Sequence, residues 1–429
     1  MDRIRIRGGN RLVGTIPIAG AKNAALPIMA ASLLSAEPLT LTNIPHLVDI
    51  ITMANLLGQH GTSFTLSGDL EPGGAAGRAL TLHTKDITSY IAPYDIVRKM
   101  RASVLVLGPL LARYGEAKVS LPGGCAIGTR PIDMHLKALE QMGAVITLEG
   151  GYVHAHVPQR LKGCEIQFDK VSVGATENLV MAATLADGVT TIHNAAKEPE
   201  VTDLIHCLKQ MGAKIEGIGT SNLVIEGVTS LRPATHHVVA DRIEAGTFAA
   251  AAVITGGDIL LAHIQPDIMT ATLEKFQEAG AEIIINDKGI RIRRDSSSPI
   301  LPCDLTTSPY PSFPTDMQAQ MMALFALSNG ASIIKETIFE NRFMHVSELT
   351  RMGANITITG NAALIRGVPD LQGAEVMATD LRASVSLILA GLVAQGETYI
   401  NRVYHLDRGY ERIEVKLRAC GADIERVPG

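Results

Sequence analysis

The sequence has little of what most metal and cofactor sites require. It has no tryptophan and only five cysteines in 429 residues, and these five are widely spaced and without a CxxC pair. That pattern predicts neither a disulfide framework nor a zinc site. The 13 histidines include no HExxH pair, no GxGxxG opens a βαβ unit, and there is no Walker lysine. We therefore expect no metal and no cofactor.

Long hydrophobic runs and an excess of charge of one sign are also missing. The longest strongly apolar run, SVLVLGPLLA, is about half of the ~20 residues that cross a bilayer, and MDRIRIRGG has no signal-peptide core. We expect a cytoplasmic protein with no membrane partner. The 38 basic and 43 acidic residues give a net charge of −5, so no general attraction to nucleic acid is expected. With no obligate protein partner evident, the expected partners are small molecules.

The chain does contain a sixfold repeat, and its length and 46% hydrophobic content predict two or more compact domains. Segments such as EQMGAVITL, KQMGAKIEG and TRMGANITI place a glycine between a helical stretch and a β-type run. Each unit is predicted to contain an Ala-rich buried helix, a strand, an amphipathic helix ending at that glycine, and a hairpin. The six glycines are Gly61, Gly143, Gly212, Gly280, Gly353 and Gly421.

The two ends of the chain complement each other. The last repeat stops at ADIERVPG without a returning strand, and the chain opens with an unassigned strand, DRIRIRGG. Pairing these strands would close the last unit and give an α/β fold of two domains with three repeats each. The predicted domains are residues 22–239, and residues 1–21 together with 240–429. The chain would cross between them near Ala21 and Ala240 and leave a cleft between the domains.

A glycine-rich segment around Cys125 is the first candidate site. In LPGGCAIGTRPIDMHLKAL, three glycines and a proline surround the thiol, and Pro131 is predicted to be the first residue of the following helix. Arg130 and the positive end of that helix would favour a thiolate, which indicates a reactive cysteine in a mobile loop. The alternative is a buried cysteine in an ordinary turn.

Several cations stand where a strand leads into a helix. Lys22 and Asn23 in AGAKNAALP could bind a phosphate or carboxylate, because backbone N–H groups at a helix start attract anions. Alternatively, Asn23 caps the helix and Lys22 is solvated. Arg101, Arg382 and Arg408 occupy comparable junctions and could be surface or capping cations. The repeat would bring these junctions from both domains toward one cleft, where they could grip a small dianion.

Asp316, in SFPTDMQAQ, opens another predicted core helix. The simpler interpretation of this aspartate is a helix cap. A carboxylate that faces the same cleft could instead accept a proton from a substrate hydroxyl.

At these residues the sequence resembles the enolpyruvyl transferase family, specifically its UDP-N-acetylglucosamine 1-carboxyvinyltransferase branch. The resemblance covers essentially the whole chain. It rests on long motifs in order, among them GAKNAALP, LPGGCAIGTRPIDMHLKALEQMGA, DKVSVGAT, FPTDMQAQ, ETIFENRFMHV, ATDLRAS and DRGYERIE. It implies an inside-out α/β barrel of two domains, each built from three βαβαββ-type units, with the N-terminal strand in the C-terminal domain.

The resemblance also implies a role for each matched residue. Cys125 and Asp316 match catalytic positions. The positions expected to bind phosphoenolpyruvate are Lys22, Asn23, Arg130, Arg382 and Arg408. The positions expected to contact UDP-N-acetylglucosamine are Asn23, Arg101, Arg130, Pro131, Ile132, Asp133, Met134, Lys170, Val171, Ser172, Val173, Asp316 and Ile338.

The implied reaction is an addition followed by an elimination, at the first committed step of peptidoglycan precursor synthesis. Asp316 would take the proton of the sugar 3-hydroxyl, and Cys125 would protonate C3 of phosphoenolpyruvate. Two alternatives stay open. One is the related enzyme that acts on shikimate 3-phosphate, which lacks this cysteine loop and has a GSKS-type segment where this chain reads GAKN. The other is a nucleotide-sugar binding protein without catalysis.

Overall fold

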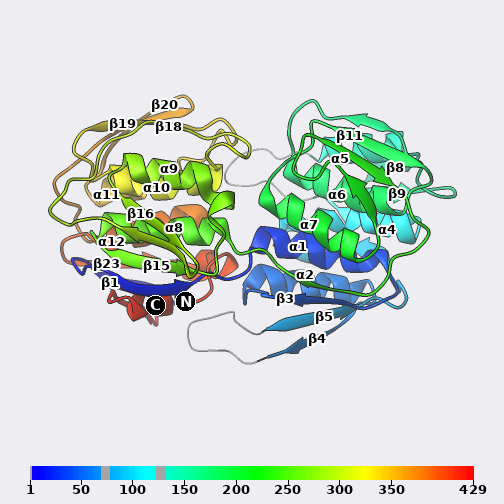
Figure 1. Ribbon diagram of the computed structural model, residues 1–429, viewed down its shortest axis with the longest axis horizontal. Helices are drawn as coiled ribbons and strands as arrows, with labels where there is room; N and C mark the ends of the chain where they lie inside the picture. Colours follow the sequence, from blue (N-terminus) through cyan, green and yellow to red (C-terminus); the bar gives the residue numbers. More distant parts are fainter. Residues whose placement is uncertain (1, 69–77, 122–131) are drawn as a thin grey trace.

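The computed structural model describes residues 2–68, 78–121 and 132–429. Figure 1 shows two halves side by side, each with helices at the centre and sheets around them. In the described residues, the strands form six four-stranded sheets, three in each half. The α/β fold therefore places the sheets outside and the helices inside.

The first half contains three units of similar element order. The first unit consists of β14 (Ala234–His237), α1 (Lys22–Ala31), η1 (Ser32–Leu34), β3 (Leu39–Thr42), α2 (Val48–Gln59), β4 (Ser63–Ser67) and β5 (Ala79–His83). The second consists of β6 (Ile91–Ala92), α3 (Tyr94–Val97), η2 (Arg101–Val106), α4 (Leu107–Arg113), β7 (Glu116–Ser120), α5 (Asp133–Gln141), β8 (Val145–Glu149) and β9 (Tyr152–His156). The third consists of β10 (Glu165–Gln167), α6 (Val173–Thr184), β11 (Val189–His193), α7 (Pro199–Gln210), β12 (Lys214–Glu216) and β13 (Asn222–Glu226).

The second half repeats this order. Its first unit consists of β2 (Val13–Pro17), α8 (Arg242–Ile254), β15 (Asp258–Ala262), η3 (Pro266–Met269), α9 (Thr270–Glu278), β16 (Glu282–Asn286) and β17 (Gly289–Arg293). The next consists of β18 (Leu305–Thr306), η4 (Thr315–Met317), α10 (Gln318–Phe325), β19 (Ala331–Lys335), α11 (Val346–Arg351), β20 (Asn355–Thr359) and β21 (Ala362–Arg366). The last consists of β22 (Glu375–Met377), α12 (Leu381–Gly391), β23 (Glu397–Asn401), η5 (Val403–Arg408), α13 (Ile413–Ala419), β24 (Asp423–Val427) and β1 (Arg3–Arg7).

Each sheet has one parallel pair of strands and two antiparallel pairs. In the sheet β10-β11-β13-β12, for example, β10 runs parallel to β11, and β13 is antiparallel to both of its neighbours. The unit predicted from the repeat pattern alone, helix, strand, helix, strand, strand, omits this first parallel strand. Four of these strands, β6, β10, β18 and β22, have only two or three residues. They are too short to show an alternating pattern.

The repeated glycines end the second helix of every unit, as predicted. All six have a positive φ, from 95° at Gly280 to 103° at Gly212. The residue after each glycine returns a backbone hydrogen bond to the last turn of the helix, as Ala144 does to Leu139 and Ala354 to Leu349. This is the Schellman arrangement, which glycine enters without steric cost. It turns the chain from each helix into the following hairpin.

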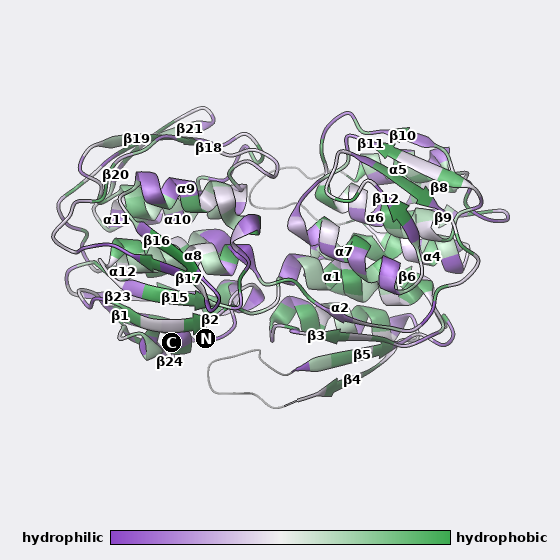
Figure 2. Ribbon diagram, in the orientation of Figure 1, coloured by the Kyte–Doolittle hydropathy of each residue, from purple (hydrophilic) through white to green (hydrophobic). Residues whose placement is uncertain are grey.

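The Ala-rich helices form the cores. Every residue of α8 from Ile243 to Ile254 is buried, and α10 and α12 are buried along nearly their whole length. The apolar colouring of these central helices is visible in Figure 2. The buried apolar residues form two clusters, one from Ala21 to Val238 and the other from residues 4–18 and 240–424. Among the described helices, none is long and apolar enough to cross a membrane.

The chain passes between the halves twice, at adjacent points. Gly20 and Ala240 form an antiparallel bridge there, and a Cβ on Gly20 would lie 1.8 Å from the carbonyl oxygen of Asn43. The expected pairing of the chain ends is present, since β1 lies between β23 and β24 and pairs antiparallel with both. Figure 1 shows the two termini close together on the same half.

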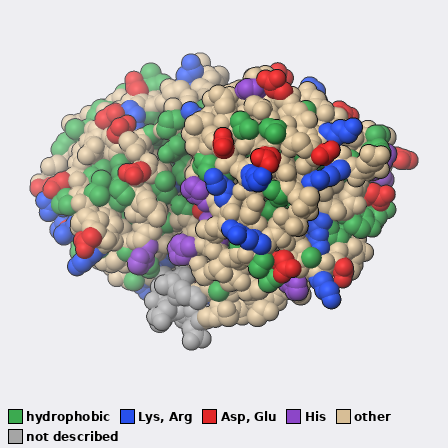
Figure 3. All heavy atoms as spheres, turned by 45° about the vertical axis from the view of Figure 1, so that its right-hand side comes forward, with side chains coloured by type: hydrophobic (Ala, Val, Ile, Leu, Met, Phe, Trp, Pro, Cys, Tyr) green, Lys and Arg blue, Asp and Glu red, His purple; other side chains and the backbone are tan. Residues whose placement is uncertain are grey.

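On the face shown in Figure 3, acidic and basic side chains are interspersed.

Candidate functional site

Asp316 lies between two arginines in the second half. It belongs to the short helix η4, and its carboxylate contacts Arg342 Nη2 at 2.7 Å and Arg382 Nη2 at 2.9 Å. Burial alone would raise the pKa of Asp316, but the charges of Arg382 and Arg342 outweigh it and hold the pKa well below the ordinary aspartate value. Asp316 is not a helix cap, because the residue at the cap of η4 is Pro314.

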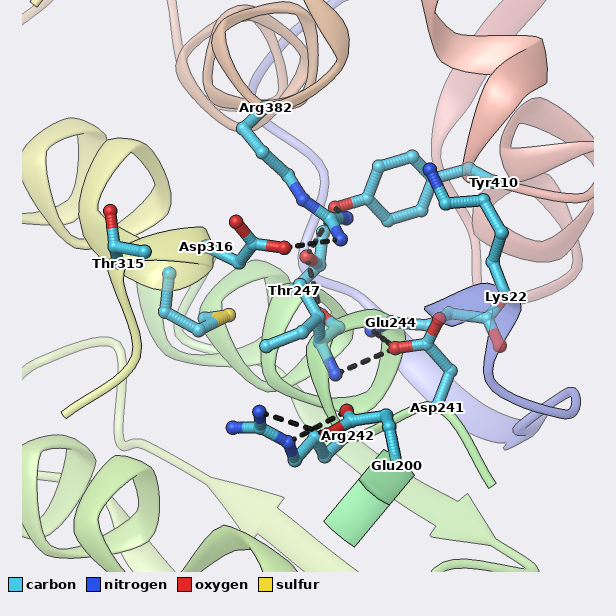
Figure 4. A network of polar contacts seen from close by, with 12 residues as sticks. Lys22, Glu200, Asp241, Arg242, Glu244, Thr247, Thr315, Asp316, Arg382 and Tyr410 are labelled. Atoms are coloured by element: carbon cyan, nitrogen blue, oxygen red, sulfur yellow. Dashed lines mark hydrogen bonds and ion pairs between the residues drawn. The ribbon is translucent and has the colours of Figure 1, made fainter. Parts of the chain in front are cut away.

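Arg382 is a buried cation of the site and not a surface residue. It stands in the first turn of α12, is 5% exposed, and donates a second hydrogen bond to the hydroxyl oxygen of Tyr410 at 3.2 Å. Figure 4 shows its guanidinium group between Asp316 and Tyr410. The Tyr410 hydroxyl also lies 2.9 Å from that of Thr247 on α8. The cation is therefore held by Asp316 and Tyr410, and Tyr410 is held in turn by Thr247.

A second carboxylate, Asp49, joins cations from both halves. Asp49 lies on α2 of the first half; Lys22 Nζ is 3.3 Å from it, and Nε of Arg408, on η5 of the second half, is 2.9 Å from it. Lys22 is 8% exposed, which excludes the solvated alternative. Asn23 is exposed, and the cap of α1 is Ala21, so Asn23 does not cap the helix.

The charged groups around Asp316 and those around Asp49 lie close enough to interact electrostatically. Burial lowers the pKa of Lys22, Asp49 opposes that effect, and the charges of Arg382, Arg408 and Asp316 also act on the same ammonium group. The structure thus brings four of the predicted residues, Lys22, Arg382, Arg408 and Asp316, together where the halves meet. Three cations within reach of each other are suited to bind a small dianion.

A further group of predicted residues surrounds His135, on α5. Arg101 and Asp133 both act electrostatically on this imidazole, and a Cβ on Gly174, at the start of α6, would lie 3.5 Å from its ring. His135 Nδ1 lies 3.0 Å from the side-chain amide nitrogen of Asn178, which must be the donor. His135 therefore connects the start of α5 with α6. The α6 helix begins at Val173, and the hydroxyl of its cap, Ser172, accepts a hydrogen bond from Ala175 N–H at 3.3 Å.

The other predicted residues are less tightly grouped. Ile132 is buried, Met134 and Val171 are partly buried, and Lys170 is exposed. Ile338 follows β19, and its N–H donates to Glu336 at 2.8 Å. In the described residues, the helix after the glycine-rich segment is α5, which begins at Asp133. Cys125, Arg130 and Pro131 lie outside the described residues.

Sequence reasoning missed four residues of this region: Asp49, Arg342, Tyr410 and His135. Arg342 and Tyr410 occur in the motifs ENRFMHV and DRGYERIE, so the segments were noticed but these side chains were not. Asp49 follows Val48 in NIPHLVDI, where nothing in the local pattern marks it. Its partner Arg408 is 359 positions away in the chain, a contact that only the fold reveals.

The buried His135 predicts that stability depends on pH. Burial, and then the charge of Arg101, lower the pKa of His135 from 6.5 to about 4. Between these values the unfolded chain takes up a proton that the folded chain does not, so the free energy of unfolding falls as the pH falls. Urea unfolding at pH 7 and pH 5 should show a loss about 2 kcal/mol larger for the native sequence than for H135Q.

The matching control for that comparison is the difference between the two proteins at pH 8. There the imidazole is neutral in both states, so the difference reports only the cost of the substitution itself. Equal losses of stability in both proteins between pH 7 and pH 5 would contradict the prediction.

Comparison with known proteins places the chain in a family. The family model for EPSP synthase (3-phosphoshikimate 1-carboxyvinyltransferase) matches residues 6–417. The UDP-N-acetylglucosamine 1-carboxyvinyltransferase of Paramagnetospirillum magneticum is 62% identical over 427 residues, which cover 100% of this chain and 99% of that protein. The protein of the same name from Granulibacter bethesdensis is also 62% identical, with 100% of both chains covered.

Solved structures agree with this relationship. The enolpyruvyl transferase NikO from Streptomyces tendae superposes with a TM-score of 0.88 at 25% identity, covering 100% of this chain and 99% of that one. The EPSP synthase of Acinetobacter baumannii, at 20% identity, shares the fold with a TM-score of 0.75 over the full length of both chains. The α/β fold class and the resemblance inferred from the sequence are confirmed. The chain belongs to the enolpyruvyl transferase family, in its UDP-N-acetylglucosamine 1-carboxyvinyltransferase branch.

Proposed function

We propose that this protein transfers the enolpyruvyl group of phosphoenolpyruvate to the 3-hydroxyl of UDP-N-acetylglucosamine and releases phosphate. The observation that carries the proposal is the cation and carboxylate cluster at the meeting of the halves, in a chain 62% identical over its full length to relatives of that name. The reaction would be the first committed step of peptidoglycan precursor synthesis, carried out in the cytoplasm without an obligate protein partner.

The donor would bind to the cations that Asp49 and Asp316 now pair with. Phosphoenolpyruvate carries a phosphate and a carboxylate, and Lys22, Arg382 and Arg408 offer an ammonium and two guanidinium groups of opposite charge. Arg130, and Asn23 at the exposed edge of α1, would complete this subsite. Asp49 holds Lys22 and Arg408 near each other before the donor arrives, so these cations need little rearrangement when it binds.

The acceptor would extend from Asp316 across to the first half. The N-terminus of the 12-residue helix α6 suits the diphosphate of the nucleotide, because its free N–H groups and dipole favour an anion. Lys170, Val171, Ser172 and Val173 belong to that segment. Arg101 and the stretch from Arg130 to Met134 would lie beside the nucleotide, with Asp316 and Ile338 near the sugar.

The chemistry requires Asp316 to become a better base than it is in the empty site. Paired with two arginines, it is ionised but weakly basic. When the donor draws Arg382 away, its pKa would rise and it could take the proton of the 3-hydroxyl. The hydroxyl oxygen bonds to C2 of phosphoenolpyruvate while Cys125 gives a proton to C3, which forms a tetrahedral ketal. Cleavage of the bond from C2 to the phosphate oxygen then releases phosphate, and transfer of a methyl proton back to the Cys125 thiolate yields the enolpyruvyl ether.

We also propose that the two hydrophobic cores correspond to domains that close on the substrates. The first domain would be residues 22–239, and the second residues 1–21 with 240–429. The paired crossing segments at Gly20 and Ala240 would act as the hinge. Closure would exclude water and strengthen the attraction between the cations and the developing charge.

Phosphate release from phosphoenolpyruvate tests the function. UDP-N-acetylglucosamine should support release, and shikimate 3-phosphate should not. Release with shikimate 3-phosphate alone would assign the chain to the other reaction. Binding of UDP-N-acetylglucosamine without any release of phosphate would favour a nucleotide-sugar binding protein and overturn the proposal.

Replacing Asp49 by asparagine should destabilise the empty protein. The substitution leaves the buried Lys22 ammonium without its carboxylate, at an expected cost of about 3 to 5 kcal/mol, which should lower the midpoint of thermal unfolding. Added inorganic phosphate should raise that midpoint more in D49N than in the native protein, because the unpaired cations bind it more tightly.

The matched control for D49N is D95N. Asp95 also pairs with a cation, Arg98 at 3.3 Å, but both side chains are at least half exposed, so little stability should be lost. The role of Asp49 would be refuted if D49N and D95N had the same midpoint with and without phosphate.

A further inference from the structure

Glu336 is a buried carboxylate immediately after strand β19. It is 1% exposed, and its two oxygens accept four hydrogen bonds. Oε1 accepts from the Thr307 hydroxyl at 2.8 Å and from the N–H groups of Ile338 and Phe339 at 2.8 and 3.2 Å. Oε2 accepts from the Thr315 hydroxyl at 2.9 Å. Four donors use about all the acceptor capacity of a carboxylate, so its orientation is fixed.

One of these donors leads directly to Asp316. Because the Thr315 hydroxyl gives its proton to Glu336, its lone pairs are free to face Arg342, and Arg342 Nη1 donates to it at 2.8 Å. Nη2 of the same guanidinium group contacts Asp316 at 2.7 Å. The result is a directional chain from carboxylate to hydroxyl to guanidinium to carboxylate. Figure 4 shows Thr315 next to Asp316 at the start of the same short helix.

The other donors lead to a second part of the acceptor subsite. Ile338, the residue expected to contact the UDP-sugar, has its backbone fixed through its N–H on Glu336. The Thr307 hydroxyl that donates to Glu336 accepts from the N–H of Thr337 at 3.0 Å, so the segment after β18 is fixed to the segment after β19. One buried side chain therefore sets the position of both segments.

We propose that Glu336 is a positioning residue for the acceptor, acting on Asp316 through Thr315 and Arg342 and on the UDP-sugar through the backbone of Ile338. This inference rests on the proposed function and deepens it. It makes Thr315 the intermediate whose hydroxyl must both donate and accept. The charged groups that act on Asp316 are Arg342 and Arg382 at contact distance, with Lys22 and Arg242 farther away.

The test compares two substitutions of Thr315. T315V keeps the shape of the side chain but removes the hydroxyl, whereas T315S keeps the hydroxyl. T315V should lower kcat with UDP-N-acetylglucosamine about 10- to 100-fold, since it breaks two hydrogen bonds to charged groups, and T315S should restore most of it. The KM for phosphoenolpyruvate should stay within about threefold, because the donor cations are untouched.

The pH profile separates positioning from mere stabilisation. Without the Thr315 hydroxyl, Arg342 is held less firmly on Asp316 and lowers its pKa less, so the acidic limb of kcat/KM should move to higher pH in T315V. E336Q should show the same shift, because the three donors at Oε1 would retain the amide oxygen and leave the NH2 group, which cannot accept a hydrogen bond, facing the Thr315 hydroxyl. D304N is the control: Asp304 also accepts a backbone N–H from β19, that of Ile333 at 2.7 Å, and should keep the native profile.

Two results would overturn the inference. One is native kcat and an unshifted acidic limb in both T315V and E336Q. The other is equal loss of kcat in T315V and T315S in proportion to a lower thermal midpoint, which would assign the network to fold stability alone. Both differ from failure of the proposed function itself, in which the native protein would release no phosphate.

Discussion

D316N is expected to lower kcat for phosphate release about 10²- to 10⁴-fold, the usual contribution of a general base. Asparagine has the same shape as aspartate but cannot take the proton of the sugar hydroxyl. It also removes the negative charge that Arg342 and Arg382 now contact at 2.7 and 2.9 Å. The measurement is steady-state phosphate release with saturating phosphoenolpyruvate and UDP-N-acetylglucosamine, together with the dissociation constant of the nucleotide sugar.

The control for D316N breaks a similar pair away from the site. Asp258 accepts hydrogen bonds from Nε and Nη2 of Arg291, both at 2.7 Å, on the outer sheet of the same half, so D258N should keep native kcat. Unchanged kcat in D316N, with the nucleotide sugar still bound, would exclude Asp316 as the base. Reduced affinity with normal kcat would assign it to acceptor binding only.

C125A is expected to lower kcat by a similar factor, about 10²- to 10⁴-fold, because the substitution removes the acid that is expected to protonate C3. Burial raises the pKa of each of the four described cysteines, with Cys303 at about 11. At neutral pH these thiols are protonated and unreactive. A single equivalent of iodoacetamide should therefore modify Cys125 first, and mass spectrometry of the digested protein would locate the label.

The control for C125A is C303A, which removes a partly exposed thiol of raised pKa and should keep native kcat. Labelling of Cys303 or Cys164 before Cys125 would contradict the reactive thiol. So would native kcat in C125A.

Much of the fold could be predicted from the sequence, because one local signal is repeated in every unit. A glycine with positive φ ends six helices, and its spacing reveals the units before any pairing is known. The pairing of β1 with β24 followed from counting strands. The parallel strands β6 and β18 escaped detection, because two residues cannot show a period and their pairing depends on the neighbouring strand.

The charged residues of the site could be predicted from the sequence, but the ion pairs that they form could not. Cations at helix starts were visible in the sequence, and four of the predicted residues meet in the structure. The simpler alternatives for Lys22 and Asp316 failed for a common reason. A capping or solvated interpretation considers only neighbours in the chain, whereas Asp49, the partner of Lys22, and Arg382, a partner of Asp316, are distant in the sequence. The capping alternative for Asn23 failed because the cap of α1 is Ala21. The roles of all the predicted site residues, Cys125 and Arg130 among them, stay predictions.

The position of β1 between β23 and β24 determines when its sheet can form during translation. Among the described strands, β1 is synthesised first, and the two strands that flank it, β23 and β24, are synthesised last. The core of the first half can form while translation continues, whereas the sheet of β1 stays incomplete until β23 and β24 have been synthesised. During that interval β23 and β24 lack their shared neighbour, and a nascent chain in this state would be exposed to pairing with another copy. Deleting residues 1–7 should leave β23 and β24 without their shared neighbour in the finished protein, which should then stay exposed to pairing with another copy.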